Sequence, residues 1–118
     1  ATIKTLESGE IYGHIDGLGE KVRDGLRDVF GRHKLPASVT GVGSTFGVHF
    51  MPEPPRSVGD AARCDPKATH AFFSHMLDRG IVCLSPNISH SWISSAHTAA
   101  DIEEYLSAAE DFVRRYKP

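Results

Sequence analysis

Apolar residues recur at steps of three and four between residues 12 and 34, from Ile15 to Phe30. This spacing puts them on one face of an α-helix, while acidic and basic residues occupy the opposite face. We therefore expect an amphipathic helix over residues 12–34 that buries its apolar face. Pro36 ends the pattern, because proline is not tolerated in a helix beyond its first turn.

Two further helices follow from the same kind of pattern. Asp65 is a typical N-cap, and the apolar stripe after it runs up to Gly80, which predicts a helix over residues 66–79. Thr98 and Asp101 have the spacing of a capping box, and the apolar stripe after them reaches almost to the C-terminus. The chain is therefore expected to finish in a long amphipathic helix.

Residues 39–51 are rich in β-branched and aromatic side chains and contain several glycines. Two strands joined by a tight turn at Gly43 fit this composition, since glycine readily adopts the positive φ of hairpin turns. In the second strand, apolar residues alternate with others. One face of that strand is expected to pack on the helices, and His49 is expected to point away from that core.

Residues 80–98 predict a short strand, an irregular loop and a second short strand before the last helix. Cys83 would lie on the first of these strands and face the core. Residues 52–64 contain three prolines and are expected to form a surface loop. Residues 1–11 have a helix-like pattern without a capping residue, which is typical of a helix that starts earlier in a longer chain.

The expected order of elements is helix, hairpin, helix, two short strands and helix. This order favours a single α+β domain of residues 1–118, a two-layer sandwich with helices on one face of a small, mainly antiparallel sheet. The other face of the sheet is partly apolar. Another domain is therefore expected to lie against it.

The composition excludes several classes of partner. Apolar residues make up 40% of the chain, charged residues 24%, and the formal net charge is -2, so we expect no nucleic acid partner and no membrane partner. No apolar run is long enough to cross a bilayer and no signal peptide is visible, which favours a cytoplasmic location. Cys64 and Cys83 lack the spacing of a zinc site, and we expect both to be reduced.

No catalytic motif is complete in this sequence. His70 and His75 are five residues apart instead of four, and few carboxylates or cysteines accompany them, so we expect no metal site. A serine hydrolase would need His90 or His97 as its base, but the Gly-x-Ser-x-Gly elbow is absent. The lysines fall on predicted polar faces or near the termini, where an amine stays protonated and unreactive. We therefore expect no catalytic residue, with a small esterase as one alternative.

Three segments, residues 42–46, 72–81 and 95–102, are similar in order and spacing to the C-terminal domain of glutamate-1-semialdehyde aminomutases and related class III, pyridoxal-phosphate-dependent aminotransferases. The resemblance spans nearly the whole chain. It implies the small domain of a fold-type I enzyme, with residues 1–11 as a truncated helix that links it to a large, cofactor-binding domain.

The same resemblance implies that the cofactor lysine and the phosphate-binding residues belong to the large domain. We therefore expect no cofactor in this chain and pyridoxal phosphate in the parent enzyme, where it serves as an electron sink. The implied partners are that large domain and a small amino-acid or amine substrate. The implied parent enzyme is a homodimer.

The resemblance also points to the loop before the last strand. Where the aminomutases have Pro-Ser-x-Phe-Glu-Ala, this chain has residues 85–90, and Ser89 takes the place of the glutamate. This departure leaves both an aminomutase and a transaminase open. Asn87, Ser89 and His90 are the expected substrate contacts, and the chain alone is expected to be inactive. The alternative is a free-standing α+β binding module that shares only the fold.

Overall fold

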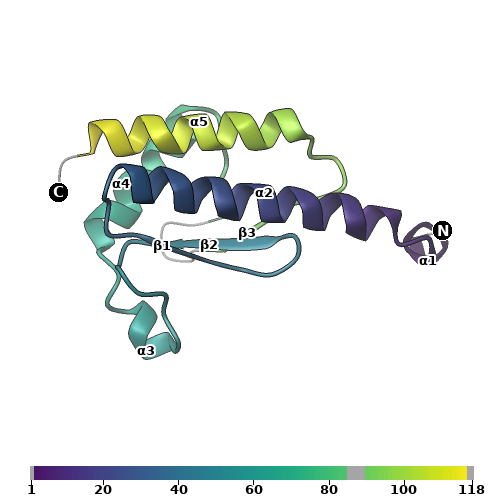
Figure 1. Ribbon diagram of the computed structural model, residues 1–118, viewed down its shortest axis with the longest axis horizontal. Coiled ribbons are helices and arrows are strands. Elements are labelled where there is room, and N and C mark those ends of the chain that lie inside the picture. The colour runs from purple at the N-terminus through teal and green to yellow at the C-terminus, as the bar shows by residue number, and fades with distance from the viewer. Residues whose placement is uncertain (1, 85–89, 117–118) are drawn as a thin grey trace.

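The computed structural model describes residues 2–84 and 90–116. In Figure 1, helices α2 and α5 run side by side over a small sheet, α4 lies behind them, and α3 extends away from the body. This arrangement confirms the predicted two-layer α+β fold. The elements in chain order are α1 (Thr2–Glu7), α2 (Glu10–Arg32), β1 (Ser38–Thr40), β2 (Thr45–His49), α3 (Val58–Ala61), α4 (Pro66–Asp78), β3 (Ser91–Trp92) and α5 (Ala99–Arg115).

The sheet has the strand order β1-β2-β3 and is antiparallel throughout its described residues. Val39 lies opposite Val48 in the predicted hairpin, and Phe46 lies opposite Ser91 on the other edge of β2. The strand predicted just after residue 80 is not formed, since residues 81–84 pair with no described strand. Cys83 does pack against the core as predicted, but from an irregular segment.

The first long helix differs from the prediction at both ends. It begins at Glu10, and Gly9 with φ 74° separates it from α1, so the expected linking helix is broken there. It ends at Arg32, before Lys34 adopts a left-handed φ of 54°. The N–H of Leu35 then donates to the carbonyl of Phe30 across 3.0 Å, which is the long bond of a Schellman motif.

The predicted caps of the other two helices are confirmed. The Asp65 carboxylate accepts hydrogen bonds from the first backbone N–H groups of α4, and Gly80 follows that helix with φ 77°. The Thr98 hydroxyl and the Asp101 carboxylate form a complete capping box at the start of α5. Residues 52–64 were predicted as a loop without regular structure, but they contain the short helix α3.

The apolar faces of α2, α4 and α5 close together on the sheet to form one core. Phe112 of α5 lies at its centre, with ring centroids 5.1 Å from Phe72 and 5.9 Å from Phe50. These rings meet edge to face, the arrangement that aromatic quadrupoles favour.

The hairpin turn lies directly against α2. A Cβ atom built on Gly19 would lie 1.9 Å from the carbonyl oxygen of Gly43, so only glycine permits this approach. The Arg23 guanidinium, also on α2, donates to the carbonyls of Gly43 and Thr45, the latter across 3.0 Å. Helix α2 thereby fixes the strand that carries Phe46.

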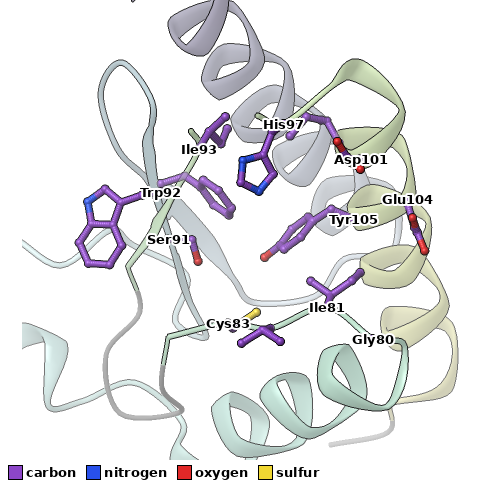
Figure 2. A pocket seen from close by; sticks show the side chains of 13 residues that line it. Gly80, Ile81, Cys83, Ser91, Trp92, Ile93, His97, Asp101, Glu104 and Tyr105 are labelled. Carbon is purple, nitrogen blue, oxygen red and sulfur yellow. The ribbon is translucent and has the colours of Figure 1, made fainter. Parts of the chain in front are cut away.

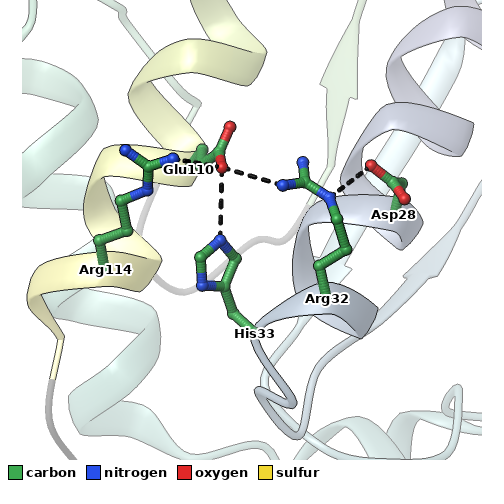
Figure 3. Close-up of polar contacts among 5 residues, drawn as sticks. All are labelled: Asp28, Arg32, His33, Glu110 and Arg114. Carbon is green, nitrogen blue, oxygen red and sulfur yellow. Dashed lines mark hydrogen bonds and ion pairs between the residues drawn. The ribbon is translucent and has the colours of Figure 1, made fainter.

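Ion pairs tie the C-terminal end of α5 to its neighbours. Glu110 Oε1 accepts hydrogen bonds from Arg32 at 3.1 Å and Arg114 at 2.9 Å, and His33 Nε2 lies 3.4 Å away (Figure 3). The hydrogen bond from Arg32, with support from His33, lowers the pKa of Glu110 to about 2. We call Glu110 and its neighbour Asp111 the carboxylate clamp.

The second carboxylate of the clamp faces the other helix. Asp111 pairs with Arg79, which follows α4, and with Arg115 at 2.9 Å on α5 itself. His75 Nε2 of α4 lies 3.6 Å from the same carboxylate. Adjacent residues of α5 therefore hold it to α2 on one side and to α4 on the other.

Candidate functional site

One of the three predicted substrate contacts lies at the edge strand β3 of the sheet. Asn87 and Ser89 lie outside the described residues. His90 is described, is exposed, and immediately precedes β3. An exposed imidazole at a strand end is free to contact a ligand, which keeps His90 as a candidate.

His49 lies near this edge and is more buried than its place in the sequence predicts. It was expected to point away from the core, and it does lie outside the core cluster, on the face of the hairpin that carries Thr40, but the residue is only 6% exposed. Its Nε2 atom lies 2.8 Å from the Thr40 hydroxyl, a diagonal neighbour on the same face of the hairpin. Burial lowers the pKa of His49, and the nearby His90 lowers it further. His49 is therefore a neutral, hydrogen-bonded part of the sheet.

A cavity of about 400 Å³ opens between residues 80–83, β3 and the N-terminal half of α5. Figure 2 shows the Tyr105 hydroxyl pointing into this cavity, towards Ser91 and Cys83. The Tyr105 ring is buried and packs edge to face on Phe46, with centroids 5.4 Å apart. We call this space the α5 cavity.

The start of α5 determines which side chains face the α5 cavity. The backbone N–H of Thr98 donates to Asp101 Oδ2 across 2.6 Å, and the backbone N–H of Asp101 donates to the Thr98 hydroxyl across 3.3 Å. With the first turn fixed in this way, positions 101, 104 and 105 share one helical face. Asp101, Glu104 and Tyr105 all line the cavity.

His97 lines the same end of the cavity as Asp101. Its Nδ1 atom accepts a hydrogen bond from the backbone N–H of Ser94 across 3.0 Å. Its own carbonyl accepts a hydrogen bond from His14 Nε2 of α2 across 2.9 Å. These two contacts fix the position of residue 97 just before α5.

The site contains no activated nucleophile among the described residues. Burial raises the pKa of the Cys83 thiol and of the Tyr105 hydroxyl, so both stay protonated at neutral pH. The Ser94 hydroxyl does approach His97 Nδ1 at 3.0 Å, but that nitrogen already accepts from the Ser94 backbone within a local turn. The hydrolase alternative gains no support from this contact.

The α5 cavity does not fit pyridoxal phosphate. The α5 cavity presents the carboxylates of Asp101 and Glu104 and, in its described lining, neither lysine nor arginine, so it would repel a phosphate group. Lys21, the lysine of α2, is paired with Glu103 at 2.8 Å. Residues 2–84 and 90–116 also contain no group of three or more His, Cys, Asp or Glu placed to hold a metal ion.

Sequence reasoning did not find the α5 cavity. Tyr105 was assigned to the apolar stripe of the last helix, and its ring does pack in the core. The missed signal is the hydroxyl at a core position, together with carboxylates one and four residues before it on the same helix face. No helix in the described part of the chain is long and apolar enough to cross a membrane.

No family model matches the chain, but its sequence is similar to glutamate-1-semialdehyde 2,1-aminomutases. It is 35% identical over 109 residues to a glutamate-1-semialdehyde 2,1-aminomutase of Thermus thermophilus, a match of 92% of this chain and 26% of that enzyme. It is 33% identical over 116 residues to the Methanothermobacter thermautotrophicus enzyme of the same name, covering 98% of this chain and 27% of the relative. The chain thus spans about a quarter of the length of these relatives.

Solved structures share its fold. A β-phenylalanine aminotransferase from Variovorax paradoxus matches 85% of this chain and 23% of its own, with a TM-score of 0.77 and 29% identity. A glutamate-1-semialdehyde aminomutase from Pseudomonas aeruginosa PAO1, solved in complex with PMP, matches 89% of this chain and 23% of its own, with a TM-score of 0.81 and 24% identity. In each of these proteins the matched part is a minor portion of the whole.

Proposed function

Because this chain belongs to the family of glutamate-1-semialdehyde aminomutases and class III aminotransferases, and matches a C-terminal region of it, we propose that it closes part of the substrate pocket of a pyridoxal-phosphate-dependent enzyme. The observation that carries this proposal is the extent of the match. Relatives align with almost every residue of the chain, while the chain spans about a quarter of their length. The remaining three quarters leave room for a separate, cofactor-binding domain.

In this role the chain shapes a pocket and supplies no reacting group. The cofactor, when bound to the large domain, provides the electron sink for amino-group chemistry. The exposed imidazole of His90 would donate or accept a hydrogen bond at the substrate. Asn87 and Ser89, outside the described residues, are proposed to contact the same substrate, which would be a small amino acid or amine.

A hybrid enzyme tests the proposal. The 118 residues would replace the matching region of the Thermus thermophilus aminomutase, and bound pyridoxal phosphate would be followed by absorbance while a panel of amino donors is added. We expect the hybrid to bind the cofactor and to convert it to the amine form with at least one donor. The aminomutase truncated before this region should react at least about a hundredfold more slowly, because its pocket lacks a wall.

Two controls make the result decisive. His90→Ala in the hybrid should weaken donor reactivity while the cofactor absorbance stays unchanged, whereas His70→Ala, an exposed histidine on α4, should change neither. The isolated 118-residue chain mixed with pyridoxal phosphate should show no protein-bound cofactor. A folded, cofactor-loaded hybrid that reacts with no donor would favour a free-standing binding module.

A further inference from the structure

The α5 cavity is acidic, and its described lining has no fixed positive charge. Asp101 and Glu104 both line it, and the described lining contains neither lysine nor arginine. We propose that this cavity binds a small organic amine in its ammonium form, attached to an apolar body about the size of one aromatic ring. The inference uses contacts within this chain alone, so it is independent of the proposed function.

The interior of the cavity suits an apolar body. The buried side chains of Phe46, Ile93 and Ile102 form part of its wall, and Ile81 packs beside them from the irregular segment. Its volume of about 400 Å³ lies within the range of roughly 300–1,000 Å³ that is usual for small-molecule pockets. Apolar walls with a few convergent polar groups are the usual composition of such pockets.

The Tyr105 hydroxyl is the polar group in the interior. The residue is only 9% exposed, and the hydroxyl points into the cavity (Figure 2). It makes no hydrogen bond within the described residues, and because it faces the cavity a ligand can reach it. A ligand N–H group would supply a hydrogen-bond partner, because the phenol oxygen accepts as well as donates.

The carboxylates at the rim retain binding capacity. Asp101 uses its Oδ2 atom for both capping contacts with Thr98, which leaves Oδ1 for a ligand. Glu104 has no ion pair within the described residues, whereas the adjacent Glu103 is paired with Lys21 at 2.8 Å. An ammonium group at the rim would complete charge-assisted hydrogen bonds with these oxygens.

Trp92 makes binding measurable, because it is the single tryptophan of the chain and it lines the cavity. The 118-residue chain would be titrated with 2-phenylethylamine, with neutral 2-phenylethanol and with anionic 3-phenylpropionate while Trp92 fluorescence is followed. We expect saturable binding of the amine, binding of the alcohol at least about fivefold weaker, and no saturable binding of the carboxylate. Nuclear magnetic resonance shifts at Tyr105 and Ile93 should report the same dissociation constant.

Variants distinguish binding of the amine in the α5 cavity from nonspecific attraction of a cation to surface carboxylates. Glu104→Gln and Tyr105→Phe should each weaken 2-phenylethylamine binding at least about threefold, while Glu103→Gln on the adjacent, Lys21-paired position should not change it. Tyr105→Phe keeps the ring on Phe46, so the variant should fold. Equal affinity for 3-phenylpropionate, or unchanged affinity in both Glu104→Gln and Tyr105→Phe, would overturn the proposal. Because no cofactor or hybrid is used, failure here leaves the hybrid experiment unaffected.

Discussion

The two halves of α5 use their polar side chains in different ways. In the C-terminal half, Glu110 and Asp111 are both paired, and they tie the helix to α2 and α4. In the N-terminal half, Glu103 pairs with Lys21 of α2, but Glu104 has no ion pair and the Tyr105 hydroxyl no hydrogen bond among the described residues. The C-terminal half therefore uses both carboxylates to hold the fold together, whereas the N-terminal half also presents groups without a described partner to a cavity. Such groups are characteristic of binding sites, where stability is not optimised.

The largest effect on stability is expected in the clamped half. Phe112→Ala removes the ring at the centre of the aromatic cluster and leaves a cavity, which should lower the free energy of unfolding by about 3–5 kcal/mol. Urea unfolding followed by circular dichroism measures the change. Phe112→Leu, which keeps most of the buried volume, is the matched control and should lose much less. A loss below about 1 kcal/mol for Phe112→Ala would show that this half does not hold the fold.

The second prediction concerns the contact between α2 and the hairpin turn, and its effect on the free energy of unfolding. Gly19→Ala should destabilise the protein by about 1–3 kcal/mol, because its methyl group would overlap the carbonyl of Gly43 in the hairpin turn. Gly17→Ala is the control: nothing lies within 4 Å of a Cβ there, so the variant should gain about 0.5–1 kcal/mol from helix propensity. Thermal and urea unfolding of the pair measure the difference. Stabilisation by both alanines would contradict the close contact between α2 and the turn.

The third prediction is that Glu110 of the clamp makes the stability of the fold depend on pH. The pKa of Glu110 is lowered from 4.5 to about 2 in the folded protein, chiefly by the hydrogen bond from Arg32. The stability contributed by its pairs is therefore fully present above pH 4.5 and is lost as the pH falls towards about 2. Glu110→Gln should flatten the loss of unfolding free energy across this window, as measured by urea unfolding at several pH values.

The control for the clamp comes from the other half of the same helix. Glu104→Gln removes a carboxylate that has no cation partner in the described structure, so it should leave the pH dependence as in the unchanged protein. Equal flattening by the Glu110 and Glu104 variants would show that the two halves of α5 do not differ in their electrostatics.

The features that the sequence predicted correctly depend on neighbours in the chain. The capping box at Thr98, the N-cap at Asp65 and the left-handed Gly80 are local signals, and each is confirmed. Lys34 takes a left-handed conformation, which is usually found at glycine. The Schellman hydrogen bonds at the end of α2 stabilise it there. The end of α2 was therefore predicted too far along the chain.

The features that the sequence missed depend on distant contacts. Residues 81–84 keep the alternating exposure of a strand but have no described strand partner, and alternation alone does not reveal whether a partner exists. His49 is buried because other parts of the chain cover it, which its position in β2 does not show. The α5 cavity joins segments that are separated in sequence, so no single motif encodes it.

The smallest effect on stability should come from Tyr105→Phe. This variant tests most directly whether the two halves of α5 differ. Because the hydroxyl has no described partner, its removal should change the free energy of unfolding by less than about 0.5 kcal/mol, or raise it slightly. Thr98→Ala, which removes the cap of the same half-helix, should cost about 1 kcal/mol and shows that the assay detects changes there. A loss above about 1 kcal/mol for Tyr105→Phe would mean that the hydroxyl is a structural group. With a small loss, any decrease in amine affinity belongs to the binding site itself.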